Sequence, residues 1–547
     1  MKNKLLYWPV LLSCLLNTLH ISAQSNPFDL YLEPLTINSL PGVQSYAYGQ
    51  YNDYWLIAGG RLDGLHKAMG MGMMGTPFPA SGNNNQLIVV NPATQQVYTS
   101  PLTSLAVDIQ EQMSSTNAEF FQEGNYLYLI GGYGYSSAAS KHITFSKLIA
   151  VDLPGIINAI IAGNSINSYI RQINDPEFQV TGGELEKIDD VYYLVGGHNF
   201  DGTYHHMMGM GMFTQTYTNQ LRKFRLSDNG TNINITHLAA ITDTLAFHRR
   251  DYNVVKQIMP DGKQGLTAFS GVFQVSADIP YLNCVNIDSN GYSINNSFSQ
   301  YYNHYQCANL PVYSAAENQM HTLFFGGIAQ YFDSAGVLTQ DNNVPFVKTI
   351  ARVSRDANGV MSEYKLPVEM PSLLGAGSEL IPADSLPIFE NGVLKLDDLS
   401  SDTTLVGYIY GGISSPQANV FTGSMMGSNG TSASAKIFKV YLVKNQPATS
   451  VHELNKQSQH SLQLQVSPNP NDGTFRISYF LPKPTLVDIF ISDATGRMVS
   501  HRVISDASEG QNLLTYRLGA YIISALKPLR RKQHKESSFI HKNTLLV

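Results

Sequence analysis

The sequence contains few charged residues, two tryptophans and three cysteines in 547 positions. Charged side chains make up 14% of the chain, whereas an average soluble protein has roughly 25%. The net charge is only −6 and the basic residues form no stripe, which argues against a nucleic-acid-binding protein. Beyond the N-terminal region no segment reaches ~18 consecutive apolar residues, so the sequence predicts no transmembrane span.

Tyrosine and glycine are abundant instead. The chain has 31 tyrosines and 44 glycines, together with many asparagines, serines and threonines. Sparse charge with this composition is typical of a β-rich extracellular protein. The length is enough for about two to four ordinary domains, or for one large repeat domain with an addition.

The first residues have the pattern of a secretory signal peptide. Two lysines precede an apolar run over residues 5–16, and a small-residue cleavage site ends at Ala23. Lipoprotein cleavage before Cys14 is an alternative, but two leucines follow this cysteine where a polar tether is expected. We therefore predict a signal peptide over residues 1–23, export through the periplasm, and a protein that is secreted or held on the outer cell surface.

Removal of the signal peptide leaves two cysteines, Cys284 and Cys307. An exported protein can join them in a disulfide, because its compartment is oxidising. Two buried free thiols are the other alternative, and the sequence leaves both open.

One pattern recurs along the chain: an apolar or aromatic strand that ends in paired glycines. An extended segment precedes each copy, and further short strands follow it, which predicts units of four strands. Such units in radial repetition are typical of β-propeller blades, and glycine permits the positive φ and close backbone approach that a tight turn needs. The six copies occupy residues 54–60, 126–132, 192–197, 266–271, 321–327 and 408–412, and the fourth is degenerate.

These strands resemble the kelch repeat family over residues 28–444, although most units lack the family's tryptophan in the fourth strand. The resemblance implies an all-β fold with a six-bladed kelch-like β-propeller over residues 25–444. The last unit ends after its third strand, and we expect residues 30–37 to supply the missing strand and close the ring. A short helix is expected at residues 156–161, between the third and fourth strands of the second unit.

A polar linker over residues 445–460 separates the propeller from a C-terminal module. Alternating strands and Asn-Asp-Gly turns in the module predict a small β-sandwich. Residues 461–547 resemble the C-terminal sorting domain of type IX secretion, except that residues 527–535 are unusually basic. The resemblance implies recognition by the type IX secretion machinery and transport across the outer membrane. The motifs that carry it are 468–470, Gly473, 493–497, 509–510 and 519–522.

Ten of the 17 methionines lie in three segments that follow the Gly-Gly of the first, third and sixth units. The pentapeptide Met-Gly-Met-Gly-Met occurs at both 69–73 and 208–212. All three segments are expected on one rim of the ring, with His66, His205 and His206 beside two of them. The ten residues are Met69, Met71, Met73, Met74, Met207, Met208, Met210, Met212, Met425 and Met426.

Three hypotheses account for this rim. Thioether and imidazole groups form a soft ligand set that suits Cu(I), so copper is one candidate cofactor, with His66, His205 and His206 as further ligands. Methionine also makes adaptable apolar contacts with partners, which favours an interface. The third hypothesis is packing of the loops over the channel mouth.

Four further residues are candidates for the channel: His198, His248, Arg249 and His304. Clustered imidazole and guanidinium groups at a channel mouth can bind an anionic sugar or perform acid–base chemistry. The alternative interpretation is that they form structural hydrogen bonds between inner strands.

No complete catalytic signature occurs in the sequence. Galactose-oxidase-like copper enzymes and periplasmic sialic-acid epimerases share the architecture, but no motif of either can be matched residue by residue, and a shared fold alone is a weak argument. We therefore predict a secreted or cell-surface binding protein with an unknown carbohydrate or protein partner, whose methionine-rich rim is the ligand, partner or Cu(I) site. The alternative is a carbohydrate-active or copper-dependent enzyme that uses the channel. Convergent histidine, tyrosine and acidic side chains at the channel floor would favour catalysis, and an apolar methionine rim over a plain channel would favour binding.

Overall fold

The computed structural model describes residues 26–66, 77–207, 210–334, 337–420 and 430–444, together with short segments of the C-terminal region (465–467, 474–481, 485–492, 498–508, 510–517, 527–529 and 542–546). The chain divides into two compact units, Met1–Asn445 and Gln446–Val547.

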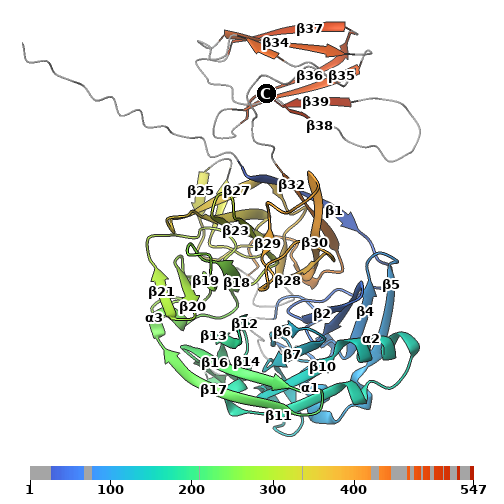
Figure 1. Ribbon diagram of the computed structural model, residues 1–547, viewed down its shortest axis with the longest axis vertical. Helices are drawn as coiled ribbons and strands as arrows, with labels where there is room; N and C mark the ends of the chain where they lie inside the picture. Colours follow the sequence, from blue (N-terminus) through green and yellow to red (C-terminus); the bar gives the residue numbers. More distant parts are fainter. Residues whose placement is uncertain are drawn as a thin grey trace, which may run out of the picture. The chain divides into compact units, whose positions relative to one another are not determined.

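The first unit is a six-bladed β-propeller (Figure 1). Each blade is an antiparallel sheet whose strands follow one another outward, and the first strands, among them β2, β6, β12, β18 and β28, surround the central axis (Figure 1). The predicted all-β, six-bladed fold is therefore confirmed.

The first three blades span roughly the first half of the ring. Their strands are β2 (Ala47–Tyr51), β3 (Tyr54–Ala58), β4 (Gln86–Asn91) and β5 (Gln96–Pro101); β6 (Glu119–Glu123), β7 (Tyr126–Ile130), β10 (Lys147–Asp152) and β11 (Ile170–Asn174); and β12 (Glu184–Ile188), β13 (Val191–Val195), β16 (Gln220–Asp228) and β17 (Ile233–Thr242).

The last three blades complete the ring. Their strands are β18 (Asn253–Ile258), β19 (Gln264–Phe269), β20 (Cys284–Asp288) and β21 (Gly291–Asn295); β22 (Asn309–Ser314), β23 (Gln319–Phe325), β26 (Thr349–Arg355) and β27 (Met361–Glu369); and β28 (Leu374–Pro382), β30 (Thr403–Ser414), β32 (Ile437–Lys444) and β1 (Phe28–Leu35).

The N-terminal strand β1 closes the ring. It pairs antiparallel with β32 from Phe28 opposite Lys444 to Leu35 opposite Ile437. The sixth blade therefore takes its fourth strand from the beginning of the chain, as the sequence predicts. Because the circle is complete, the blade exposes no unpaired third strand.

Paired glycines directly follow the second strand in four blades, where the backbone turns against the next blade; Ser270-Gly271 replaces the pair in the fourth blade, and the pair of the sixth lies within β30. Gly59 and Gly60 have φ of 66° and 81°, a region that glycine adopts without a steric penalty. A Cβ atom on Gly59 would lie 2.6 Å from the carbonyl oxygen of Ser115, which belongs to the segment leading into the second blade. The repeat seen in the sequence is thus a requirement of blade-to-blade contact.

The hydrophobic core lies between neighbouring sheets, and each pair of adjacent blades shares a cluster of buried apolar residues. One cluster joins Trp55 of the first blade to Tyr410 of the sixth. Burial of apolar surface between blades holds the ring together, since it stabilises folding by about 25 cal/mol per Å².

The predicted helix is confirmed as α2 (Leu153–Ala162), between the third and fourth strands of the second blade. The Asp152 side chain accepts a hydrogen bond from the Gly155 N–H, and Gly163 ends the helix with φ of 69°, so both ends carry their usual caps. The other helices are α1 (Val107–Met113), α3 (Thr244–Phe247) and the 3-10 turns η1 (Ala80–Gly82), η2 (Leu102–Ser104), η3 (Asn167–Tyr169) and η4 (Pro176–Phe178).

Short hairpins and strands extend the blades. Three of them are inserted after the second strand of a blade: β8 (Tyr133–Ser136) with β9 (Lys141–Thr144), β14 (His198–Met207) with β15 (Met210–Tyr217), and β24 (Tyr331–Ser334) with β25 (Val337–Gln340). Two small strands, β29 (Leu394–Lys395) and β31 (Ser432–Ala433), pair with β22 and β30.

Cys284 and Cys307 are both buried free thiols, the second of the two alternatives left open by the sequence. Burial raises the pKa of each thiol to about 12, which makes both poor nucleophiles. In the part of the chain that the structure describes, no helix is long and apolar enough to cross a membrane.

The second unit contains two sheets. One consists of β33 (Gln465–Ser467), β34 (Thr474–Leu481) and β37 (Gly510–Arg517); the other consists of β36 (Met498–Ala507), β35 (Thr485–Ser492), β39 (Lys542–Leu546) and β38 (Lys527–Leu529). Most of the predicted sorting motif (468–470, Gly473, 493–497, Glu509 and 519–522) lies outside the described residues. The sandwich and the sorting domain stay predictions.

Candidate functional site

Two cavities lie along the axis of the propeller. The residues that lead into the inner strands line one of them, which we call the mouth cavity, with a volume of about 350 Å³. The later residues of the same strands line the other, the channel cavity, of about 520 Å³. Gln306 contributes to both. The Gly-Gly turns lie on the side of the mouth cavity, because the second strand of each blade runs antiparallel to the first.

Aromatic rings form one wall of the mouth cavity. The His66 ring stacks on Tyr204 of β14 at 4.8 Å between centroids and lies 5.2 Å from Phe78. Phe273 and Tyr305 line the same cavity. These rings come from the first, third, fourth and fifth blades or the segments between them, so only the closed ring brings them together.

Polar groups gather beside this wall. Arg250 forms an ion pair with Asp251 and donates a hydrogen bond from Nε to the Tyr217 hydroxyl at 3.1 Å. Asn117 Nδ2 donates to Asp251 Oδ1 at 3.2 Å. The buried Asn117 Oδ1 accepts no hydrogen bond from any described residue.

The described flanks of the three methionine segments meet at this mouth. His66, which precedes the first segment, stacks on Tyr204 in the hairpin that carries the second. The Leu65 N–H donates to Thr431 Oγ1 at 2.9 Å, so the first segment also meets the flank of the third. Met207 is the last residue of β14, and Met210 and Met212 belong to β15. The remaining residues, Met69, Met71, Met73, Met74, Met208, Met425 and Met426, lie outside the described residues.

The predicted copper ligands are only partly placed. His205 and His206 lie on β14, where His206 pairs with Gly211. The structure describes the backbone of these two residues but not their side chains. Among the described residues, no group of three His, Cys, Asp or Glu side chains is arranged to hold a metal ion. Copper binding through sulfur therefore stays a prediction.

His198 and His248 lie beside the mouth cavity without lining it. The His248 ring stacks on Tyr217 at 3.8 Å between centroids, and the His198 ring meets Tyr217 edge to face at 5.8 Å. Burial lowers the pKa of His198 well below its usual value, and the charge of Arg250 lowers it further. These two histidines therefore support Tyr217, which in turn holds Arg250.

Arg249 and His304 point into the protein. The Arg249 guanidinium donates to the carbonyl groups of Ala246 and Asn283 at 2.9 and 3.1 Å, and also to that of Ser270. His304 Nδ1 accepts from the Gln330 N–H at 2.9 Å, and its Nε2 lies 2.9 Å from the Gln300 carbonyl oxygen. Both side chains make the structural hydrogen bonds of the alternative interpretation.

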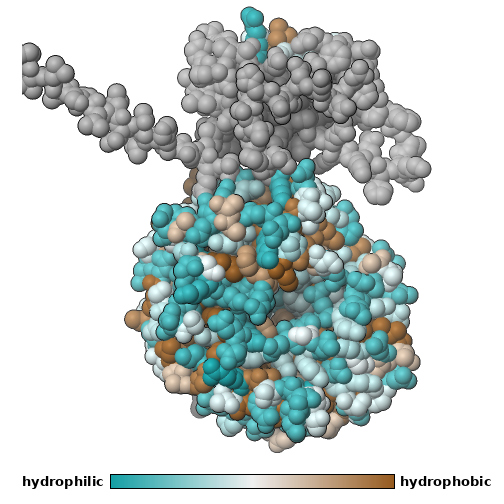
Figure 2. All heavy atoms as spheres, in the orientation of Figure 1, coloured by the Kyte–Doolittle hydropathy of each residue, from teal (hydrophilic) through white to brown (hydrophobic). Residues whose placement is uncertain are grey.

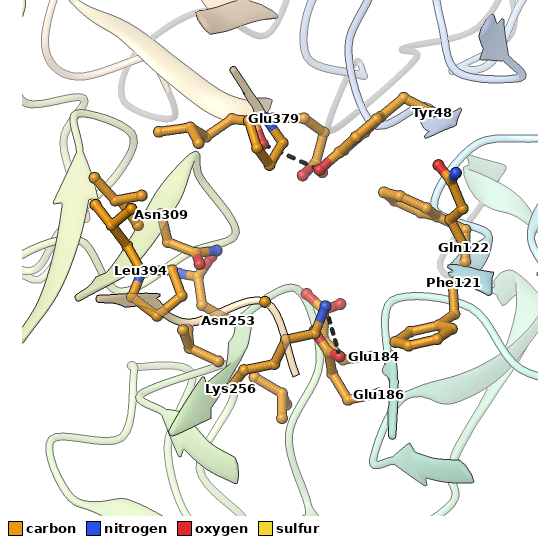
Figure 3. Close-up of a pocket in the computed structure, with 18 of the residues that line it drawn as sticks. Tyr48, Phe121, Gln122, Glu184, Glu186, Asn253, Lys256, Asn309, Glu379 and Leu394 are labelled. Atoms are coloured by element: carbon orange, nitrogen blue, oxygen red, sulfur yellow. Dashed lines mark hydrogen bonds and ion pairs between the residues drawn. The ribbon is translucent and has the colours of Figure 1, made fainter. Parts of the chain in front are cut away.

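Three glutamates and a lysine line the channel cavity: Glu184, Glu186 and Lys256 lie together on one side, and Glu379 lies next to Tyr48 on another (Figure 3). Glu184 and Glu186 are two residues apart on β12 and so project from the same face of the strand. Lys256 on β18 lies 3.4 Å from Glu186, measured from Nζ to Oε2. Gln306 Nε2 donates to Glu379 Oε1 at 3.2 Å. The space-filling view shows a hollow in the middle of the ring with mostly hydrophilic side chains around it (Figure 2).

Burial raises the pKa of all three carboxyl groups. The pKa of Glu379 rises to about 8, and that of Glu184 rises well above its usual value because burial is reinforced by the charges of Glu379 and Glu186. The pKa of Glu186 is raised by burial and lowered by Lys256. At neutral pH, Glu379 is therefore largely protonated, and burial favours the protonated form of Glu184.

These glutamates are not among the site residues predicted from the sequence. The sequence does contain a pattern that indicates them. Glu-Leu-Glu at 184–186 lies in the segment before the third Gly-Gly strand, which is a predicted innermost strand. Charged residues at alternate positions of such a strand point to a polar channel. Glu379 and Lys256 could not be joined to them by spacing, because they come from other blades.

Comparisons with known proteins add little beyond the fold. No protein-family model matches the sequence, and no curated protein matches it. A solved structure titled "Structure of YjhT" aligns with 75% of this chain and 99% of its own, at 10% identity and a TM-score of 0.40. Assignment of this chain to the six-bladed β-propellers accordingly rests on its own strand pairing.

Proposed function

We propose that this chain is an exported, kelch-type propeller that binds a carbohydrate in the mouth cavity. The observation that carries the proposal is the combination of an aromatic wall with a polar floor in one cavity. Sugar rings have apolar faces that stack on aromatic rings, and hydroxyl edges that bond to carboxylate, amide and guanidinium groups. His66 and Tyr204 supply the wall, and Asn117, Arg250 and Asp251 supply the floor.

Variants of Tyr204 and Asn117 test this proposal. We expect glycan-array binding by the mature protein, and a roughly tenfold or greater loss of affinity in Tyr204→Ala and Asn117→Ala. Tyr31→Ala is the matched control, because Tyr31 is 53% exposed on the outermost strand of the sixth blade. Equal binding by all three variants, or no glycan binding at all, would contradict the proposal.

Export is the second part of the proposal, with residues 1–23 as signal peptide and residues 461–547 as the sorting domain for the type IX machinery. Its support is the motif in the sequence and the separate compact unit at Gln446–Val547. A reporter fused behind a signal peptide and ahead of residues 446–547 is expected to reach the surface or medium of a host with this system. Retention of that fusion in the periplasm would argue against it.

The methionine rim is a second candidate binding site. It is favoured by the contact between the described flanks, Leu65 with Thr431 and His66 with Tyr204. Copper titration under reducing conditions tests the Cu(I) hypothesis, and replacement of all ten rim methionines by leucine is expected to abolish uptake. If the replaced protein keeps its copper and its partner binding, both the metal and the interface hypotheses are wrong.

An enzymatic role in the channel is the alternative function. Convergence of Glu184, Glu186, Glu379 and Tyr48 in one cavity favours it, since a carboxyl group with a pKa near neutrality can act as an acid and a base. Turnover of a sugar that disappears in Glu379→Gln would replace the binding proposal by this one.

A further inference from the structure

The channel cavity has more carboxyl groups than partners for them. Glu186 has Lys256 as its ion-pair partner, and Glu379 accepts a hydrogen bond from Gln306. Among the described residues, none donates a hydrogen bond to the Glu184 carboxyl, although burial and two neighbouring carboxyl groups surround it. The cavity can therefore accept a positively charged donor that the protein does not supply.

A metal ion is not the best match for this lining. The described residues contain no group of three His, Cys, Asp or Glu side chains close enough together to hold one. An ammonium group suits carboxyl groups that are further apart, because it has three N–H donors on one atom. Lys256 shows that the wall accepts such a group, since its ammonium lies 3.4 Å from Glu186 and 4.9 Å above the ring of Phe121.

The rest of the lining suits hydroxyl groups. Gln50, Gln122, Asn253, Gln306 and Asn309 line the cavity, and the Gln122 and Asn253 amides also bond to the backbone. Asn309 is among those labelled in Figure 3, and its side chain makes no hydrogen bond to any described residue. Amides offer both a donor and an acceptor, as neighbouring hydroxyls require. The volume of about 520 Å³ is in the range of small-molecule sites.

A long connection of the sixth blade borders this cavity. Between β28 and β30 the chain crosses to the fifth blade, where β29 pairs in parallel with β22. Asn391 Nδ2 donates to the Gln257 carbonyl at 3.1 Å, which fixes the connection to the fourth blade. Its residues Ile388 and Leu394 line the cavity. Three blades thus hold an apolar border next to the polar wall, an arrangement typical of ligand sites.

From these observations we propose that the channel cavity is a second binding site, distinct from the mouth cavity, for a small polyol that carries a primary ammonium group. The ammonium lies among Glu184, Glu186 and Glu379, and the hydroxyl groups bond to the amide side chains. The inference does not depend on carbohydrate binding at the mouth.

Binding of a cation here is linked to loss of protons. Glu379 holds a proton in the free protein at neutral pH, burial favours the protonated form of Glu184, and a nearby positive charge favours the ionised forms of both. The other ionisable groups around Glu184 are Glu186, Lys256 and, further away, Glu119 of β6; Tyr48 of β2 faces Glu379. Affinity therefore rises with pH from about 6 to 8, as long as the ligand keeps its charge.

Isothermal titration of the mature protein with glucamine and with glucitol tests the proposal, because these polyols differ only in an ammonium and a hydroxyl group. We expect glucamine to bind at least about tenfold more tightly than glucitol at pH 7. We also expect titrations in two buffers of different ionisation enthalpy to show net proton release. Equal affinity for the two polyols, or no binding of glucamine up to about 10 mM, would overturn the proposal.

Variants locate the site. Glu184→Gln and Glu379→Gln keep the shape of the side chain and are each expected to weaken glucamine binding at least about tenfold. Glu363→Gln is the matched control, because burial also raises the pKa of Glu363 to about 8 but this residue lies outside the cavity. Tyr204→Ala, at the mouth, is expected to leave glucamine binding unchanged. Binding that survives both channel substitutions, or that is lost with Tyr204, places the ligand elsewhere and refutes the inference.

Discussion

Two arginines show how strongly the contribution of one side chain depends on its surroundings. Arg249 is fully buried and its guanidinium donates to backbone carbonyl groups, whereas Arg225 pairs with Asp190 at the surface with half of its side chain exposed. Burial lowers the pKa of Arg249 to about 10, so it still carries its charge at neutral pH. The folded protein can bury this charge only because the guanidinium N–H groups donate hydrogen bonds to carbonyl oxygens.

We therefore expect Arg249→Ala to lower the free energy of unfolding by on the order of 3 to 5 kcal/mol, because it leaves buried carbonyl groups without donors and opens a cavity. Arg225→Ala is the control and is expected to have little effect, since exposed ion pairs contribute little. Urea unfolding of both variants measures the difference. Similar losses in the two would contradict the structural role of Arg249.

His304 predicts a dependence of stability on pH. Burial lowers its pKa to about 4 in the folded protein, whereas an unfolded histidine has a pKa of about 6.5. As the pH falls below about 6.5, His304 becomes protonated in the unfolded chain but stays neutral in the folded protein. The stabilising contribution of neutral His304 is therefore lost between about pH 6.5 and 4. The hydrogen bond from the Gln330 N–H also favours the neutral ring, because Nδ1 must be unprotonated to accept it.

The effect can be isolated with His304→Gln. We expect the difference in unfolding free energy between the original protein and this variant to shrink by about 2 kcal/mol between pH 7 and pH 5. Urea unfolding at the two pH values provides the measurement. A difference that stays constant with pH would mean that His304 titrates normally in the folded state.

At the scale of elements, β1 offers a test of ring closure. Phe28 and Tyr31 lie on the same strand, but Phe28 is fully buried while Tyr31 is 53% exposed. Phe28→Ala is expected to destabilise the propeller by about 3 to 5 kcal/mol, and Tyr31→Ala by much less. Thermal unfolding followed by circular dichroism compares them. A small effect of Phe28→Ala would show that closure by β1 contributes little to stability.

Elements differed in how well they could be predicted. The Gly-Gly strands and α2 were predictable, because a glycine turn, a capped helix and alternating burial leave local patterns. The hairpin of β14 and β15 was expected only as a loop. Its strands contain glycine and methionine, whose strand propensity is low or moderate, and its place is set by packing of Phe200, Tyr204 and Phe213 against Phe78.

At the scale of the whole molecule, the division into two units predicts independent stability. The propeller has its own core between blades and closes on itself. We expect residues 26–445 alone to unfold at the same midpoint temperature as the propeller transition of the longer chain that also contains residues 446–547, within about 2 °C. Differential scanning calorimetry of both proteins gives the comparison. A clearly lower midpoint for the shorter protein would mean that the second unit stabilises the first.

The sequence by itself determined the all-β fold, the number of blades and the closure by the N-terminal strand, because these depend on local periodicity and on strands that are missing or left over. Only the tertiary structure decided which side chains meet on the axis. Glu184, Lys256 and Glu379 come from three blades, separated by some seventy to two hundred positions. No spacing rule joins them, since their proximity arises from six sheets being packed in a circle around one axis.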